Sequence, residues 1–165
     1  MTLPFLISDA TYSDYTPLTP RQGLSAYYSN RGNAWAKKGD YDKAIEDYTE
    51  AITINPQYAD AYSNRGNAWS NKGDLDKAIS DFRRSIKIDP QLAEAYANLG
   101  FAFVGKWELE KAIWPLAQFL KLSPEKANIL LSILSNVSSA KWDRDPDSKR
   151  IAKIFMQETK GADIA

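Results

Sequence analysis

A stretch of this chain returns almost unchanged 34 residues later. Residues 27–44 read YYSNRGNAWAKKGDYDKA, and residues 61–78 read AYSNRGNAWSNKGDLDKA. A third copy has diverged further but keeps the spacing of an aromatic residue, a glycine and a proline: Tyr28, Tyr62 and Tyr96; Gly32, Gly66 and Gly100; Pro56, Pro90 and Pro124. A period of about 20 to 50 residues is typical of stacked supersecondary units that cannot bury their apolar faces alone. The sequence therefore predicts an array of three units.

Each unit has the pattern of two helices joined by a tight turn. Tyr28, Gly32 and Trp35 fall at i, i+4 and i+7, which places them on one face of a helix. Gly39 favours the left-handed conformation that ends a helix, and Asp40 is a suitable N-cap for the next one. The Lys-Gly-Asp sequence recurs at 72–74, and the second helices are expected to stop at the prolines of 55–56 and 89–90.

The residues at repeated positions have a packing explanation. Gly32 is expected where the two helices of a unit approach too closely for a larger side chain. Tyr28 and Trp35 are expected to fill the gaps between units rather than to stack on a cofactor or a base. Arg31 and Arg65 lie inside the repeat and are expected to pair with acidic neighbours.

The composition excludes most catalytic chemistry. The 165 residues contain no Cys and no His, which removes thiol nucleophiles, disulfides, thiolate and imidazole metal ligands, and the usual general base near neutral pH. Carboxylate pairs such as Asp42 with Glu46, and Asp76 near Ser80, lie on the polar faces of the expected helices and are interpreted as solvated. We therefore expect a non-catalytic protein without a cofactor or a metal.

Charge and hydropathy narrow the range of partners. The 21 basic residues balance the 21 acidic ones, so no net field attracts nucleic acid or anionic lipid. No stretch approaches the roughly 18 apolar residues of a membrane span, and MTLPFLI at the start lacks the charged region of a signal peptide. We expect no nucleic-acid partner, no membrane insertion and, by default, a cytoplasmic location.

The pattern of aromatic, glycine, aromatic, alanine, aromatic, alanine and proline over 34 residues resembles the tetratricopeptide repeat, with units at 25–58, 59–92 and 93–126. The resemblance implies an all-α fold, in which antiparallel helix pairs stack into a right-handed superhelical solenoid. It also implies a concave groove, lined by the first helix of each unit, that binds peptide segments of other proteins. The wording AYSNRGNAW is similar to bacterial and, more loosely, photosynthetic-lineage members of the family.

The third unit departs from this pattern. Trp107 and Glu108 replace the Gly-Asp pair of the turn, and Gly105 lies two residues early, so we expect a different turn. Pro115 would remove a hydrogen bond inside the second helix and clash with the preceding turn. Either that helix is kinked or it starts late, with Pro115 near its first turn. The irregularity is either tolerated, or it reshapes the end of the groove or builds a partner-binding ridge around Trp107 and Trp114.

Two segments of different character flank the repeats. Residues 1–24 contain three prolines and several aromatic residues, and we expect an extended segment that is either partly disordered or lies along a groove of this chain or of a second copy. Residues 127–165 are expected to form helices that cap the apolar end of the array, with Asp145 and Pro146 at the start of the last one. That last helix, around Phe155, is alternatively a surface for a partner or a second copy.

One metal motif lies in the second of these segments. Asp143, Asp145 and Asp147 alternate as in the first half of a calcium loop. Ser148 and Ile154 stand where such a loop requires glycine and a bidentate glutamate, so helix capping is the simpler interpretation of these aspartates.

Asparagine recurs on the face expected to line the groove. Asn30, Asn64 and Asn98 share one position of the three units, and a parallel row of Asn33 and Asn67 ends at Phe101. Amide side chains carry donors and acceptors that can satisfy the backbone of an extended peptide whatever its side chains. Such a row resembles the asparagine ladders described for tetratricopeptide superhelices of sugar-transferase enzymes that hold protein substrates. The alternative is that these residues cap or rigidify neighbouring helices.

A more specific precedent does not fit this groove. Chaperone-binding members of the family clamp a peptide carboxylate with asparagines and basic residues. Asn33 and Asn64 match the asparagines of that clamp. Its basic positions carry Ser29, Glu94 and Asn98 instead, so we expect no recognition of a chaperone tail.

Two functions remain at this point. The first is a non-catalytic interaction module, an adaptor or assembly factor, that binds an extended segment of a partner protein in the concave groove. The second is a structural protein that associates with copies of itself through its termini. A molecular mass that rises with concentration would favour the second.

Overall fold

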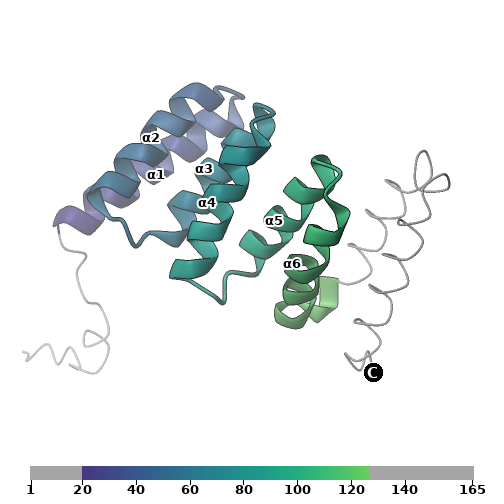
Figure 1. Ribbon diagram of the computed structural model, residues 1–165. Coiled ribbons are helices and arrows are strands. Elements are labelled where there is room, and N and C mark those ends of the chain that lie inside the picture. Colours follow the sequence, from purple (N-terminus) through teal and green to yellow (C-terminus); the bar gives the residue numbers. More distant parts are fainter. Residues whose placement is uncertain (1–19, 127–165) are drawn as a thin grey trace, which may run out of the picture.

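The computed structural model describes residues 20–126, which form six α-helices and one short 3-10 helix (Figure 1). The helices are α1 Pro20–Lys37, α2 Tyr41–Ile54, α3 Ala59–Asn71, α4 Leu75–Ile88, α5 Ala93–Gly105 and α6 Leu109–Leu122, followed by the 3-10 helix η1 Pro124–Lys126. The described residues contain no strand, so the prediction of an all-α fold is confirmed.

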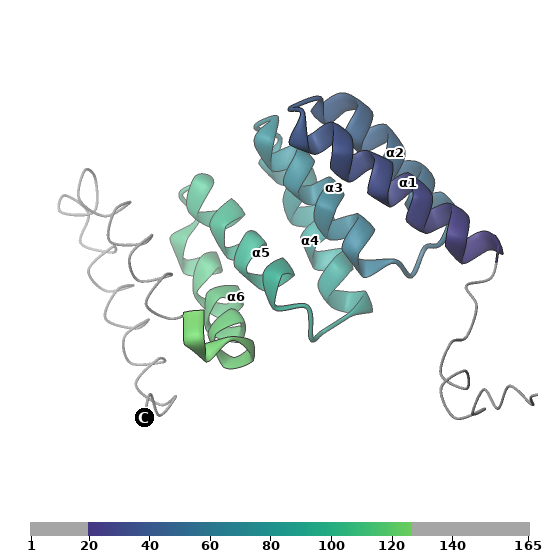
Figure 2. The same cartoon turned by 180° about the vertical axis from the view of Figure 1, so that it is seen from behind.

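The helices stack in pairs along one direction. Each helix packs most extensively within its pair, α1 on α2, α3 on α4 and α5 on α6, and the pairs are joined by packing of α2 on α3 and of α4 on α5. The first helices also touch one another, α1 with α3 and α3 with α5, whereas α2 and α4 make no comparable contact. The array therefore curves with α1, α3 and α5 on its inner side, which is the side seen in Figure 2.

The turns inside the first two pairs have the predicted chemistry. Gly39 and Gly73 adopt left-handed conformations, with φ of 80° and 84°. Asp40 and Asp74 follow them as N-caps, and each carboxylate accepts a hydrogen bond of 3.3 Å from the backbone N–H three residues later. The expected stops are also confirmed, because α2 and α4 end directly before the Asn-Pro and Asp-Pro sequences.

The turn of the third pair is a correction to the sequence prediction. Trp107 takes the left-handed conformation of the two glycines, with φ of 61°. Its N–H donates to Val104 and that of Glu108 donates to Phe103, which is the same hydrogen-bond pattern as in the other two turns. The prediction of a different turn is therefore wrong, because these backbone hydrogen bonds fix the turn even without glycine. Glu108 differs from the aspartates in making no side-chain cap.

The second helix of the third pair also starts where the other two units would place it. α6 is helical from Leu109 through Pro115, so the predicted alternative of a late start is wrong. Pro115 is fully buried, and the neighbouring face of α6 buries Ala112, Leu116 and Phe119. Packing of this face against the array outweighs the hydrogen bond that proline removes from the helix.

The first helix is longer than predicted. α1 begins at Pro20, so the extended segment predicted for residues 1–24 is wrong for residues 20–24. Proline is tolerated in the first turn of a helix, since the N–H that it lacks has no partner there. Residues 1–19 lie outside the described residues, as do residues 127–165, including the predicted capping helices and the aspartates at 143, 145 and 147.

In each pair, the second helix approaches the first most closely at a glycine of the first helix. A methyl group on Gly32 or Gly66 would lie 2.8 Å or 2.7 Å from the ring of Tyr48 or Phe82, and one on Gly100 would lie 2.5 Å from Leu116. Trp35 and Trp69 pack against the buried cluster formed by Ala44, Ile45, Tyr48 and Ala68. The predicted packing roles of the repeated glycines and tryptophans are thus confirmed.

We predict that Gly66→Ala lowers the free energy of unfolding by about 1 to 2 kcal/mol, because the new methyl group pushes against a buried ring that cannot move freely. Urea unfolding followed by circular dichroism measures the change. Gly23→Ala in α1 is the control, since nothing lies within 4 Å of the added methyl group. It is expected to stabilise the protein by about 0.5 kcal/mol. Equal effects of the two substitutions would contradict the close approach.

A second prediction concerns the strained turn. Trp107→Gly is expected to raise the free energy of unfolding by about 1 kcal/mol, because glycine adopts positive φ without a steric penalty. Trp107 is 54% exposed, so more than half of its surface is already in water in the folded protein. The reverse change at the equivalent turn, Gly73→Ala, should destabilise by about 1 kcal/mol in the same urea titration. A destabilised Trp107→Gly variant would show that the indole contributes more than its backbone strain removes.

Candidate functional site

The six residues predicted to line a groove all belong to the first helices of the three pairs in the array. They come from its three inner helices: Asn30 and Asn33 from α1, Asn64 and Asn67 from α3, and Asn98 and Phe101 from α5. Asn30 is exposed and the other five are half-buried. Because α1 touches α3 and α3 touches α5, the two rows run continuously across the three units.

Part of this set is already engaged within the protein. The side-chain oxygen of Asn33 accepts a hydrogen bond of 2.7 Å from the Tyr48 hydroxyl and another of 3.2 Å from the amide of Asn64. The two asparagines therefore join α1 to α3, and the tyrosine fixes the first of them from α2. The structure thus includes the alternative role that the sequence left open, in which an asparagine rigidifies neighbouring helices.

The other three asparagines keep their hydrogen-bonding capacity. The side chains of Asn30, Asn67 and Asn98 make no hydrogen bond to any other residue between 20 and 126. Each amide offers two N–H donors and a carbonyl acceptor, so these side chains can bind the N–H and C=O groups of an extended backbone. Phe101 packs against the buried cluster of the second and third pairs and adds apolar surface at the end of the row.

The charge on this face is low and slightly negative. Asp60 and Glu94 lie in the first turns of α3 and α5, and Lys37 lies in the last turn of α1. Ser29 is only 2% exposed, so the first of the positions that would be basic in a carboxylate clamp carries a small buried hydroxyl. The other two of these positions carry a carboxylate, Glu94, and an amide, Asn98, so none of the three carries a cation.

The two repeated arginines belong to the packing of the pairs and not to this face. Arg31 binds Asp47 through two hydrogen bonds of 2.8 and 2.6 Å, and Arg65 binds Asp81 through two of 2.8 Å. Both aspartates are buried. The hydrogen bonds to these carboxylates raise the pKa of Arg31 and of Arg65, in the second case against the opposing effect of burial. The predicted pairing with acidic neighbours is confirmed.

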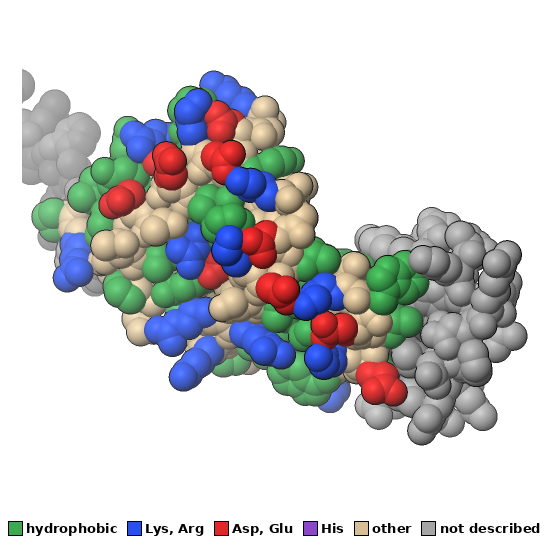
Figure 3. Space-filling view, turned by 45° about the horizontal axis from the view of Figure 1, so that its top comes forward, with side chains coloured by type: hydrophobic (Ala, Val, Ile, Leu, Met, Phe, Trp, Pro, Cys, Tyr) green, Lys and Arg blue, Asp and Glu red, His purple; other side chains and the backbone are tan. Residues whose placement is uncertain are grey.

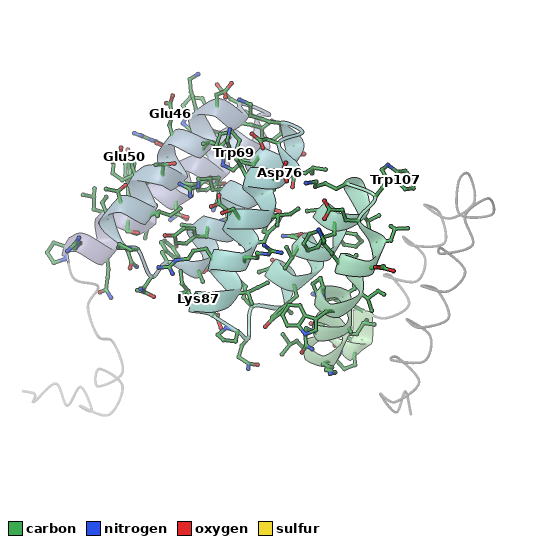
Figure 4. All side chains as sticks on the ribbon, viewed as in Figure 1. Glu46, Glu50, Trp69, Asp76, Lys87 and Trp107 are labelled. Atoms are coloured by element: carbon green, nitrogen blue, oxygen red, sulfur yellow. The ribbon has the colours of Figure 1, made fainter. Side chains whose placement is uncertain are left out.

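Two of the carboxylates that were interpreted as solvated, Asp42 and Asp76, have partners in the next unit. Asp42 of α2 forms an ion pair with Lys72, and Asp76 of α4 forms one with Lys106. Figure 4 shows Asp76 at the upper end of α4, facing the third pair. These groups join successive units at their turns, and their positions are explained by that contact.

Two absences hold for residues 20–126. No three side chains of His, Cys, Asp or Glu come together in an arrangement that could hold a metal ion. None of the helices in this range combines the length and the hydropathy that a membrane crossing requires.

Comparison with known proteins identifies the repeat. The sequence profile described as "TPR repeat" matches residues 32–73, and the profile "Tetratricopeptide repeat" matches residues 59–92. Together with the stacked helix pairs, these matches show that residues 32–92 consist of tetratricopeptide repeats and that the described residues form a solenoid of this kind. No curated protein sequence matches the chain.

Solved structures with this fold include peptide complexes. The first TPR of Spaghetti (RPAP3) bound to the HSP90 peptide SRMEEVD is 26% identical over 72% of this chain and 98% of its own, with a TM-score of 0.65. The second TPR domain of human RPAP3, in complex with the HSP70 peptide SGPTIEEVD, is 26% identical with the same coverage and a TM-score of 0.66. A crystal structure of MamA protein is 30% identical over 65% of this chain and 58% of its own, with a TM-score of 0.58.

The hydroxyl that fixes Asn33 gives a prediction about pH. Burial raises the pKa of Tyr48 from its ordinary value of 10.0 to about 12. Because the folded state disfavours ionisation, this stabilisation is complete below pH 10 and is lost as the pH rises through about 12. Urea unfolding between pH 8 and pH 12 should therefore show a steeper loss of stability in the wild type than in Tyr48→Phe. Phenylalanine fits this position, as Phe82 shows in the next pair. Parallel curves would contradict the buried hydroxyl.

Proposed function

We propose that the inner face of α1, α3 and α5 binds an extended segment of a partner protein, and that the chain serves as a non-catalytic adaptor or assembly factor. The observation that carries the proposal is the set of Asn30, Asn67 and Asn98 from the two rows, whose amides bind no other described residue. The RPAP3 complexes support it, because they are solenoids of the same class with peptides bound.

Recognition in this proposal is directed at the peptide backbone. An extended chain offers an N–H and a C=O at regular intervals, and an amide can serve either group without a change of charge. The contact between Asn33 and Asn64 holds the inner helices in register, so that the three uncommitted amides are in place before binding. Such preorganisation reduces the entropy that is lost on binding.

The charge of the inner face selects against acidic ends. Both RPAP3 structures hold peptides that end in EEVD. In this chain Glu94 and Asn98 occupy positions that would require cations, and Asp60 adds a further negative charge. A neutral or basic segment therefore fits the groove better than a peptide of the EEVD type.

Selection from a random-sequence peptide library tests the proposal. Peptides bound by the wild type should lose affinity by about tenfold or more when Asn30, Asn67 and Asn98 are all replaced by Ala, because each amide contributes about 0.5 to 1.5 kcal/mol. The matched control replaces Glu46, Glu50 and Ser80 by Ala on the outer helices, where Figure 4 shows the two glutamates on α2. Equal binding by both variants would refute the groove. A mass in light scattering that rises with concentration would favour the self-associating alternative.

The selectivity has a separate prediction. The wild type is expected not to bind SRMEEVD in fluorescence anisotropy, whereas Glu94→Lys with Asn98→Arg should improve the affinity by roughly tenfold or more through charge-assisted hydrogen bonds. Glu46→Gln with Glu50→Lys changes the net charge by the same amount on the outer face and should have no such effect. Tight binding of SRMEEVD by the wild type would show that the inner face needs no cations at these positions.

A further inference from the structure

A second surface is hollowed on the outer side of the array, between α4 and α6. The hollow has a volume of about 440 Å³. Its floor is apolar and includes Leu99 and Phe103 of α5 and Pro115 of α6, and its rim carries Arg83 and Lys87 of α4 with Lys111 and Trp114 of α6. Figure 3 shows Lys and Arg side chains gathered along the lower border of the described helices, beside hydrophobic ones.

The equivalent place one unit earlier is filled by an arginine. There Arg65 reaches between the outer helices, where it binds Asp81 of α4 and donates a hydrogen bond of 3.1 Å to the Thr49 hydroxyl of α2. Thirty-four residues later the positions of Arg65 and Asp81 carry Leu99 and Pro115. Both members of the ion pair are thus replaced by shorter apolar side chains. The hollow lies where the guanidinium group stands in the preceding unit.

The rim gains positive charge at the same junction. Arg83 and Lys87 stand 34 residues after Thr49 and Thr53. Neither forms an ion pair within the range 20–126. The guanidinium of Arg83 lies 5.7 Å from the centre of the Phe103 ring, at the border of the apolar floor. Two cations that form no ion pair with the described residues therefore line the hollow.

Trp114 is a further difference between this unit and the preceding one at the hollow. It stands at the position of Ser80, is 56% exposed, and contacts Tyr96 edge-on with ring centres 5.7 Å apart. An indole that exposes more than half of its surface beside an apolar floor is typical of a binding site and not of a packed core. The chemistry of the whole surface fits a segment that combines carboxylates with aromatic or aliphatic side chains.

We propose that residues 1–19 of this same chain bind in the hollow between α4 and α6. Within these residues Asp9 and Asp14 are the charged side chains, and no Lys or Arg occurs. Phe5, Tyr12 and Tyr15 supply the aromatic groups. The carboxylates match the unpaired rim of Arg83 and Lys87, and the rings match the apolar floor and Trp114. This occupant is complementary in both charge and hydropathy.

The start of α1, where residues 1–19 join the array, lies on the same edge of the array as Lys87 of the hollow. Arg21 Nε donates a hydrogen bond of 2.8 Å to the carbonyl of Ile54, which holds the beginning of α1 beside the end of α2. Ile88 is the equivalent residue at the end of α4, so Lys87 lies at the same edge one unit further on, as Figure 4 shows. At about 3.3 Å per residue, residues 1–19 reach about 60 Å when extended. Neighbouring packed helices are only about 10 Å apart.

The proposed docking site and the inner groove lie on opposite sides of the array. The hollow is formed by α4 and α6 with α5 as its floor, whereas the asparagine rows lie where α1, α3 and α5 meet. A bound N-terminal segment therefore leaves Asn30, Asn67 and Asn98 accessible. The proposal is independent of the peptide-binding function and fails or holds separately.

A spin label tests the proposal in the full chain. Because the chain has no Cys, a single Thr11→Cys substitution places the label within residues 1–19 alone. We expect the NMR signals of the Trp114 indole N–H and of the Lys111 backbone amide to lose intensity and to recover when the label is reduced. The side-chain amide of Asn30 on the inner face should keep its intensity. Unchanged Trp114 signals, or a loss centred on the asparagine rows, would overturn the proposal.

Two pairs of substitutions test the charge and its place. Arg83→Thr with Lys87→Thr installs the residues of the preceding unit and should restore the Trp114 signal. Lys37→Thr with Lys38→Thr removes the same charge elsewhere and should leave the loss intact. Both variants must show the thermal unfolding of the wild type. A loss that persists without Arg83 and Lys87 would overturn the proposal, and so would a loss seen only between labelled and unlabelled copies, which would assign the hollow to a second molecule.

Discussion

The contact of a helix backbone with a buried side chain across each pair determines the rest of this array. Gly32, Gly66 and Gly100 let the first helix of each pair lie directly against Tyr48, Phe82 and Leu116. At this distance the two helices of a pair cannot slide or rotate independently, because the ring or branched side chain occupies the space that a methyl group would need. The distance between the two helices of every pair follows from this contact, and the pairs then stack through α2 on α3 and α4 on α5.

Much of the fold follows from local sequence signals. Gly39 with Asp40 carries both the conformation and the cap of its turn within two residues, and the repeat shows the same pair again. Trp107 and Pro115 could not be predicted in this way. Their local preferences oppose the observed backbone, which is imposed by hydrogen bonds of the turn and by burial against the array. Contacts between distant residues decide the third unit, whereas local signals suffice for the first two.

The candidate site likewise combines features that follow from the repeat with features that depend on contacts between distant residues. The positions of Asn30 and Asn98 on inner helices follow from the period of the repeat. The engagement of Asn33 does not, because it depends on the hydroxyl of Tyr48, which Phe82 and Leu116 lack at the equivalent positions. The hollow beside Trp114 is even less visible in the sequence pattern. It arises from positions at which the copies differ, while recognition of a repeat relies on the positions that they share.

The ion pairs at the turns have a consequence for the length of the array. Lys72 reaches back to Asp42, and Lys106 reaches back to Asp76, so the second unit carries one half of a junction at either end. A duplicate of residues 59–92 inserted behind the original would meet an aspartate before it and a lysine after it, so both ion pairs at the turns would form again. The turns therefore allow the array to grow by whole units through duplication, whereas the outer helices do not, because the duplicated Arg65 would meet Arg83 at the position of Thr49.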